Sequence, residues 1–294
     1  MLTLTIDAKE KRDVMSADVP NAFIQTEMPQ GEERVMMKIT GVLVDMLSQL
    51  DPKLYGPYVV YENGRKVLYV QVLRAIYGML TASLLWYLKF RKDLEGIGFE
   101  FNPYDPCIAN RMKVGAQHTV RFHVDDLLSS HINPKVNDKF ASWLEKMYGK
   151  YKAVEPTRGK VHDYLGMIVD FSEDEVVKID MVKYVENMIR DFPDEITKKS
   201  KTPASDNLMG IGTGKALVGE QAEAFHTTVA KGLFLSKRSR PDIQPTIAVL
   251  STRVKSPNES DWKKTDKVDG ISKWDKRIDA QIMGRQLEGS QMVC

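Results

Sequence analysis

The chain has 294 residues, of which 43% are hydrophobic and 28% charged, with a formal net charge of +2 at pH 7. This length can bury a real core, and the composition is that of an ordinary soluble protein without a run long enough for a membrane helix. The small net charge neither requires nor excludes a nucleic-acid partner, and the two cysteines do not indicate a disulfide framework, which favours a reducing intracellular compartment.

The first third of the chain predicts a strand, a short helix and a hairpin. Residues 13–19 form the predicted strand, which ends near Asp18, just before a proline. Apolar residues at helical spacing predict a short helix over residues 41–50. Two β-rich runs within residues 58–70 flank Asn63-Gly64, which is the strongest short-range hairpin signal.

The middle of the chain alternates between helical and strand patterns. Leucines recur every three or four residues over residues 81–95, which predicts an amphipathic helix closed by glycines. A weak strand is expected at residues 104–112, a hairpin at 118–130, a second amphipathic helix at 135–148 and a strand at 161–171.

Counting residues 118–130 as one strand, these elements follow the order β-α-β-β-α-β. That is the ferredoxin-like order, an α+β fold in which both helices lie on one face of an antiparallel sheet. The first and third strands are neighbours in this fold. Asp18 and Asp125 are therefore predicted to meet across adjacent strands, although about a hundred residues separate them.

The stretch from His118 to His131 carries two adjacent acidic residues, Asp125 and Asp126, between β-branched and apolar runs. We interpret it as a β-hairpin with both aspartates at its tip. Neighbouring carboxylates repel one another unless a cation or a basic partner neutralises them. A divalent metal site is one interpretation, and a solvated acidic turn is the other.

The last hundred residues are less regular. Residues 194–218 form a polar linker, and its GIGTGKA stretch lacks the spacing and the Ser or Thr of a phosphate-binding P-loop. Two helices are expected within residues 219–255. Residues 256–294 combine few apolar side chains with many charges, which predicts a poorly ordered tail.

Several motifs, in order, resemble the copia-type (Pseudoviridae) LTR-retrotransposon reverse transcriptases. The HVDD stretch stands where that family has Tyr-Val-Asp-Asp, and the resemblance covers the chain from about Asp13 to Trp262. The other stretches that carry it are SADVPNAFIQTEMPQGE, LRAIYGMLTASLLWY, NPYDPCIA, DYLGM and RPDIQPTIAVLSTRV.

The resemblance implies an RNA-directed DNA polymerase that transfers nucleotides to a primer 3′-hydroxyl with two Mg²⁺ ions, or Mn²⁺ in their place. It implies that Asp18, Asp125 and Asp126 are catalytic and bind the metals, with the backbone carbonyl of Val19 as a further ligand. The chemistry agrees, because two-metal catalysis needs ions about 4 Å apart and Mg²⁺ prefers oxygen ligands.

Two further residues are assigned to nucleotide binding by the resemblance. Phe23, five residues after Asp18, resembles the steric gate that excludes a ribose 2′-hydroxyl, with a core phenylalanine as the alternative interpretation. His123 replaces the family's usual tyrosine beside the primer terminus. After Gly78 the chain has Leu-Thr and Ser-Leu where the family has Lys-Gln and Pro-Arg, so no contact is assigned there.

The resemblance also implies a domain order and partners. Residues 1–175 are expected to form the palm with the fingers mostly missing, 176–255 the thumb and the start of the connection, and 256–294 a disordered or aberrant tail. Only 17 residues precede Asp18, so we expect a fragment or gene-model remnant of a larger polyprotein. Its expected partners are an RNA template, a DNA primer, dNTPs and other parts of the polyprotein, without a membrane, in cytoplasmic virus-like particles or the nucleus.

Three alternatives remain beside this interpretation. One is a catalytically inactive remnant that keeps the palm fold, and another is an RNA-binding module with aromatic residues exposed on its central strands. The third is a zinc site made of Cys107, His118, His123 and His131. Their spacings of 11, 5 and 8 residues match no compact zinc pattern, and strand alternation places His118 and His123 on opposite faces.

Overall fold

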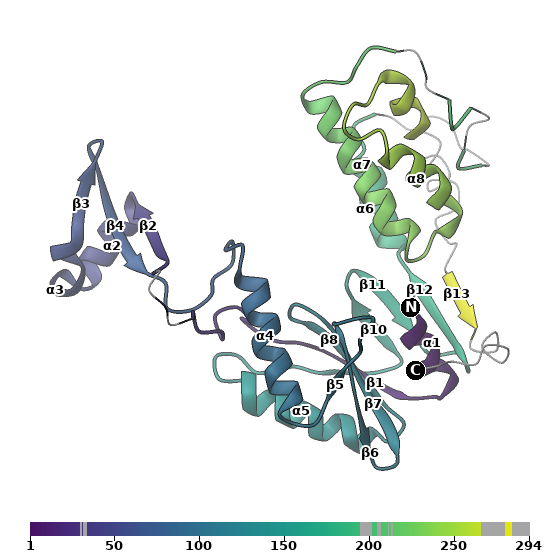
Figure 1. Cartoon of the computed structure of the whole chain (residues 1–294), viewed down its shortest axis with the longest axis horizontal. Coiled ribbons are helices and arrows are strands. Elements are labelled where there is room, and N and C mark those ends of the chain that lie inside the picture. Colours follow the sequence, from purple (N-terminus) through teal and green to yellow (C-terminus); the bar gives the residue numbers. More distant parts are fainter. Residues whose placement is uncertain are drawn as a thin grey trace.

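The computed structural model describes residues 1–29, 31, 34–194, 202–204, 207–210, 212, 214–265 and, as backbone, 280–283. The described chain is a mixed α+β structure with three antiparallel sheets. Figure 1 shows a small sheet at one end, the largest sheet in the middle and a group of helices at the other end. Within these ranges no helix combines the length and apolarity needed to cross a membrane.

The largest sheet has six strands, and every neighbouring pair is antiparallel. The first strand of the chain lies between the acidic hairpin and an edge strand, so it is central to the sheet. In spatial order the strands are β5 (Glu100–Phe101), β6 (Ile108–Lys113), β7 (Ala116–His123), β8 (Asp126–His131), β1 (Asp13–Asp18) and β9 (Thr157–Gly159).

Two helices cover one face of this sheet. They are α4 (Ala82–Glu95) and α5 (Pro134–Tyr148), close to the two predicted helices. Their buried aromatic side chains pack against alternate residues of β7, β8 and β1, as expected for the inner face of a half-covered sheet. The members from the helices are Trp86, Phe90, Leu94, Phe140, Leu144 and Tyr148, and those from the strands are Met15, Ala17, Val120, Phe122 and Leu127.

The opposite face of the large sheet is partly covered by a second sheet and by helix α1 (Leu2–Lys9). Val14 and Leu128 on this face join one hydrophobic cluster with Val169 and Val177 of the second sheet and Leu4 of α1. The second sheet has four strands, which in spatial order are β10 (Val161–Tyr164), β11 (Met167–Asp170), β12 (Val176–Asp180) and β13 (Ala280–Met283).

The prediction of a single strand over residues 161–171 is wrong. The segment folds into the hairpin β10–β11, and the edge strand beside β1 is β9 instead. The cause is a two-residue turn at Leu165 and Gly166, whose φ angles are +54° and +72°. Positive φ at both loop residues matches the right-handed twist of the flanking strands and reverses the chain there.

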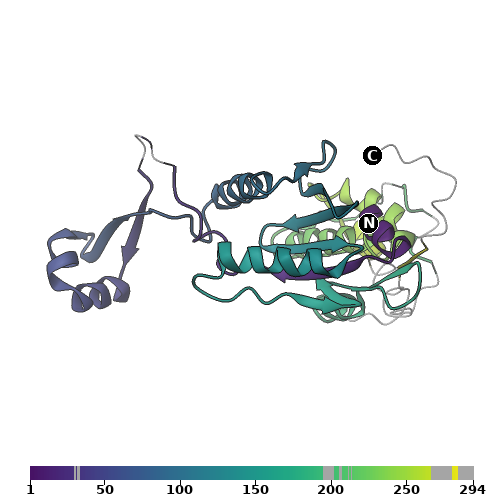
Figure 2. The ribbon, with the colours of Figure 1, turned by 90° about the horizontal axis from the view of Figure 1, so that it is seen from below.

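A third sheet stands apart from the rest of the molecule, as Figures 1 and 2 show. The predicted hairpin at Asn63-Gly64 is confirmed, with φ angles of +48° and +74° at those two residues, and the predicted short helix is confirmed as α2. The elements of this region are β2 (Met36–Thr40), α2 (Val42–Leu50), α3 (Pro52–Tyr55), η1 (Gly56–Tyr58), β3 (Val59–Glu62) and β4 (Arg65–Gln71).

The remaining elements are helical. The two helices predicted within residues 219–255 are present as α7 and α8, and Trp262 of the following segment stacks on Phe192 with ring centroids 5.2 Å apart. Of the predicted tail, residues 256–265 are described, residues 259–265 are helical, and Asp261 and Thr265 are buried. Apart from β13, the remainder of the tail lies outside the described residues. The helices of this region are α6 (Val182–Arg190), α7 (Glu220–Ser236), η2 (Pro241–Ile243) and α8 (Gln244–Ser251).

Candidate active site

Three predicted site residues form a row across the end of the large sheet. Asp126 of β8 lies directly opposite His123 of β7 on one side and Asp18 of β1 on the other. Directly opposed residues of antiparallel strands share a face, so the three side chains stand together. Alternation places this row on the face that α4 and α5 do not cover, because Phe122, Leu127 and Ala17 beside it belong to the helix-covered core.

The tip of the acidic hairpin differs from the prediction by one residue, and so does the pairing across the strands: Asp18 lies opposite Asp126, not opposite Asp125 as predicted. The loop consists of Val124 and Asp125, whereas Asp126 already pairs with His123 in the ladder. Val124 has a φ angle of +57°, an unusual conformation for a β-branched residue that costs about 1–3 kcal/mol. The loop is fastened to the first strand by the Val19 backbone N–H, which donates to the Asp125 carbonyl oxygen at 3.0 Å.

The carboxylates affect one another's ionisation. Burial and the negative charge of Asp125 raise the pKa of Asp18, and the charge of Lys152 partly offsets this increase. The pKa of Asp126 is also raised, first by burial and then by the charges of Asp125, Asp18 and Asp163. The charge of His123 acts in the opposite direction on Asp126. The end of the sheet is thus an acidic centre with too little positive charge to balance it.

Phe23, the predicted gate residue, is half-buried and packs against Tyr77, with ring centroids 4.7 Å apart. Tyr77 in turn lies close enough to the carboxylates for the charges of Asp125 and Asp18 to raise its pKa, after the larger effect of burial. This aromatic pair is therefore beside the acidic centre.

Several residues near this centre were not identified from the sequence. Tyr77 and Lys152 affect it from loops before α4 and after α5. Tyr77 lies within the LRAIYGMLTASLLWY motif, but the motif alone assigned it no contact, and Lys152 lies in none of the motifs that carry the resemblance. Trp86 of α4 donates from its indole Nε1 to the carbonyl oxygen of Val124 in the acidic loop at 2.6 Å. The tryptophan belongs to a recognisable motif, but only the fold brings it under the hairpin.

The acidic centre offers the ligand chemistry of a hard divalent cation. Asp18, Asp125 and Asp126 supply carboxylate oxygens. Burial and then the neighbouring negative charges raise the pKa values of Asp18 and Asp126, and a bound cation would relieve the charge repulsion. Among the described residues no group of three or more His, Cys, Asp or Glu side chains is already arranged to hold a metal ion. The donor types fit magnesium, and the structure shows no preassembled cage of three ligands within the described residues.

The histidines considered for zinc binding separate as strand alternation predicted. His118 and His131 are completely buried, 5.9 Å apart between ring centroids, and His118 also packs against Phe140 of the helix-covered core. His123 is exposed on the other face. Burial, together with the positive charge of Arg111, lowers the pKa of His118 to about 3, so this imidazole is neutral at physiological pH.

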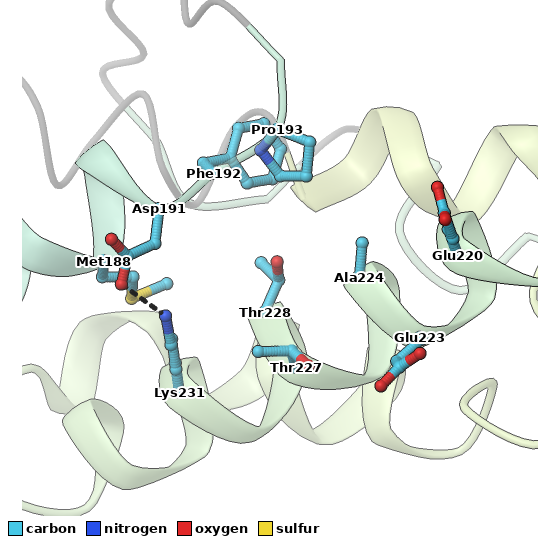
Figure 3. Close-up of a pocket in the computed structure, with 10 residues that line it drawn as sticks. All are labelled: Met188, Asp191, Phe192, Pro193, Glu220, Glu223, Ala224, Thr227, Thr228 and Lys231. Atoms are coloured by element: carbon cyan, nitrogen blue, oxygen red, sulfur yellow. Dashed lines mark hydrogen bonds and ion pairs between the residues drawn. The ribbon is translucent and has the colours of Figure 1, made fainter.

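A separate cavity of about 270 Å³ lies between α6 and α7, away from the acidic centre. Figure 3 shows Lys231 of α7 directed at Asp191, and their ion pair measures 3.0 Å. Phe192 and Pro193 close another side of the cavity, and Glu220 and Glu223 line its far end. None of the site residues predicted from the sequence lines it.

Comparison with known proteins identifies two transposon proteins as sequence relatives. The chain is 24% identical over 198 residues to the transposon Ty5-1 protein YCL074W of Saccharomyces cerevisiae, covering 67% of this chain and 62% of that protein. It is 22% identical over 206 residues to the retrovirus-related Pol polyprotein from transposon TNT 1-94 of Nicotiana tabacum. This match covers 68% of this chain and 15% of the polyprotein. The match therefore spans less than two thirds of either relative, and no family model matches the chain.

Two solved structures show a weaker likeness. Apo telomerase from Candida tropicalis has a TM-score of 0.39 at 13% identity, covering 92% of this chain and 46% of that one. Telomerase from Candida albicans, in complex with the TWJ fragment of telomeric RNA, has a TM-score of 0.31 at 10% identity. The match covers 93% of this chain and 49% of the telomerase chain. These TM-scores are too low to identify a shared fold. The two sequence relatives support a retroelement origin for the chain.

Proposed function

We propose that the chain is the RNA-directed DNA polymerase (reverse transcriptase) domain of a copia-type retrotransposon polyprotein. The observation that carries this proposal is the row of His123, Asp126 and Asp18 on the uncovered face of the large sheet, with Asp125 in the adjoining loop. The strand order β9-β1-β8-β7, with α4 and α5 on one face, supports a ferredoxin-like polymerase palm.

In this proposal the acidic centre holds two Mg²⁺ ions, or Mn²⁺ in their place, through Asp18, Asp125 and Asp126, with the Val19 carbonyl as a further ligand. The ions would supply activation of the primer 3′-hydroxyl and stabilisation of the triphosphate and its leaving group. The contribution of the chain itself is to hold the three carboxylates in position. The β1–β8 pairing fixes Asp18 opposite Asp126, and the Val19 N–H fixes the loop that carries Asp125.

Phe23 and His123 are proposed to contact the reacting nucleotides. Phe23 lies against Tyr77 beside the acidic centre, so its ring can exclude a 2′-hydroxyl from the sugar of an incoming nucleotide. His123 is exposed at the end of β7, where its imidazole can stack on or hydrogen-bond to the primer terminus. The polar template contacts that the family makes after Gly78 are not assigned, because the residues there differ.

The other regions are proposed to bind nucleic acid around this centre. Residues 1–175 are proposed to form the palm, with the separate sheet over residues 36–71 included in it. Residues 176–255 form the thumb and the start of the connection. The proposed partners are an RNA template, a DNA primer, dNTPs and the rest of the parent polyprotein, in cytoplasmic virus-like particles or the nucleus.

A catalytically inactive remnant with the same fold is the second candidate. The observation that favours it is the departure from the family pattern, with Leu80-Thr81 where the family has Lys-Gln and His123 where it has a tyrosine. In that case the acidic centre would survive only as part of an inherited fold.

Primer extension separates the two candidates. The wild-type chain is incubated with Mg²⁺, dNTPs and a DNA primer annealed to an RNA or a DNA template, beside the variants Asp125→Ala and Asp174→Ala. Asp174 is a highly exposed carboxylate that pairs with Lys11, so it serves as a matched acidic control. Extension by the wild type and by Asp174→Ala, but not by Asp125→Ala, would support the polymerase. No extension by any of the folded proteins would favour the remnant.

A further inference from the structure

The indole of Trp86 is the only side chain from the helical layer for which a hydrogen bond to the acidic loop is described. Its Nε1 donates to the carbonyl oxygen of Val124 at 2.6 Å, and Trp86 itself is only 1% exposed. The Val124 carbonyl belongs to the peptide bond between Val124 and Asp125. The hydrogen bond therefore connects α4 to the backbone directly before Asp125. The contact crosses 38 residues of sequence and passes from the core to the end of the sheet.

The loop that receives this bond is not in a relaxed conformation. Val124 has a φ angle of +57°, which a β-branched residue adopts only when its surroundings hold it there. The surroundings act from two sides. The Val19 N–H donates to the carbonyl oxygen of Asp125 at 3.0 Å, and Trp86 binds the carbonyl oxygen of Val124. Both carbonyl groups of the two-residue loop therefore have a fixed donor.

Trp86 can act as a fixed point because its own position is determined by the core. Its ring stacks on Phe90 and meets Tyr148 edge to face, with centroids 5.4 Å apart in both cases. The Tyr148 hydroxyl donates to Asp93 of α4, and the Gln25 side-chain amide donates to the Tyr148 carbonyl oxygen at 2.9 Å. The ring is thus held by α4, by α5 and, indirectly, by the segment that follows β1.

We propose that Trp86 is a positioning residue that holds the strained loop and thereby sets the direction of the Asp125 carboxylate. This inference rests on the proposed polymerase function, because the consequence of a misdirected Asp125 is a loss of chemistry. Trp86 touches no reacting group. Trp86 acts on Asp125 through its hydrogen bond to the backbone of Val124. An aromatic ring of similar shape without the N–H donor would not replace this bond.

The first test is the variant Trp86→Phe, which keeps an aromatic ring in the core and removes the N–H donor. We expect kcat for primer extension to fall about 10- to 100-fold, because small displacements of catalytic groups have effects of that order. KM for the dNTP and the Kd for primer–template should stay within about threefold, since the substrate-contacting groups remain.

Phe140→Leu is the matched control for core damage. Phe140 is equally buried in the same cluster, but its ring contacts are Phe99, His118 and Trp143, and it has none described with Trp86. We expect this variant to lower Tm at least as much as Trp86→Phe while changing kcat less than about twofold. Equal losses of kcat in the two variants, or an unchanged kcat in Trp86→Phe, would overturn the positioning role.

A second measurement does not depend on activity or on the folding of a variant. In the wild-type protein labelled with ¹⁵N-indole, exchange of the Trp86 N–H with D₂O should be slowed by at least about 100-fold relative to a free indole, since the group is buried and bonded. The signal is assigned in the wild-type protein from the nuclear Overhauser effects between the Trp86 indole N–H and the neighbouring rings of Phe90 and Tyr148. Fast exchange would overturn the inference whether or not the chain extends primers.

The two measurements also separate this inference from the proposed function. Absence of extension by the wild type contradicts the polymerase, and slow exchange in that same protein would still support a loop held by Trp86. Extension by the wild type together with full activity of Trp86→Phe contradicts the positioning role alone.

Discussion

The two ends of the hairpin β7–β8 differ in whether their polar side chains have matching partners. At the end near α5, His118 shares a hydrogen bond with the Ser129 hydroxyl at 2.7 Å, and Ser129 donates to the Asn137 side-chain oxygen at 2.7 Å. The Asn137 amide in turn donates to Asp13 at 2.7 Å. His118, Ser129 and Asn137 are completely buried, and each has a hydrogen-bond partner of suitable geometry.

At the other end, burial and then the charge of Asp125 raise the pKa values of Asp18 and Asp126, and Val124 is held in a strained conformation. A satisfied polar network contributes to a unique fold, whereas unbalanced charge and strain weaken it. Proteins retain such costly arrangements mainly where chemistry or binding needs them. The difference supports the proposal that the first end serves the fold and the second serves the proposed function.

The largest effect is expected from Asp18→Asn. It keeps the size of the side chain and removes one of the negative charges proposed to hold the metal ions, so extension should fall by at least about 1,000-fold. Circular dichroism and Tm would show that the fold is kept. A variant with more than a tenth of the wild-type rate would show that Asp18 is not part of the reaction centre.

A smaller change in specificity is expected from Phe23→Ala. Removing the ring that packs against Tyr77 opens space beside the acidic centre, so incorporation of ribonucleotides relative to deoxyribonucleotides should increase about 10- to 100-fold. The ratio of kcat/KM for dGTP and GTP measures it. An unchanged ratio with a lowered Tm would instead identify Phe23 as a residue of the core.

The satisfied end of the hairpin should respond only in stability. Ser129→Ala leaves buried groups of His118 and Asn137 without their shared partner, which should lower the free energy of unfolding by about 1–3 kcal/mol. Urea denaturation measures the loss. Extension by the folded variant should remain within about twofold of the wild type, and a loss of 100-fold would contradict the separation of the two ends.

The smallest effect is a gain of stability from Asp126→Asn without divalent ions. The folded-state pKa of Asp126 is raised, so the folded protein binds its proton more readily and the ionised form destabilises the fold above that pKa. With EDTA at pH 7 the variant should melt no more than about a degree or two higher, because solvent screens the charge of this partly exposed carboxylate. The difference should shrink as the pH falls and disappear below the unfolded-state value of about 3.8. A lower Tm at pH 7 would contradict this account.

Much of the acidic centre could be predicted from the sequence because its parts follow periodic patterns. Strand and helix periods predicted β1, the hairpin and both covering helices, and the topology then placed Asp18 beside the acidic hairpin. The strand period did not predict the turn at Leu165-Gly166, which divides one apolar run into the two strands β10 and β11. An apolar run alone does not show where the chain reverses.

The contacts that complete the centre depend on distances through space. Trp86 meets Val124, and Tyr77 and Lys152 influence the carboxylates, although no spacing in the sequence links these residues. The loop itself begins one residue earlier than predicted, since the ladder continues to Asp126. Such details follow from packing, which sequence periodicity does not encode.

The most direct test of the contrast between the two ends of the hairpin is a titration of the full chain with Mn²⁺. The concentration of free Mn²⁺ is measured from its electron paramagnetic resonance signal. We expect the wild type and Ser129→Ala to bind the ion with similar affinity. The double variant Asp18→Asn with Asp125→Asn should lose at least one bound ion per chain. Equal binding by the wild type and the double variant, or no binding by either, would contradict the assignment of the acidic end to metal-dependent chemistry.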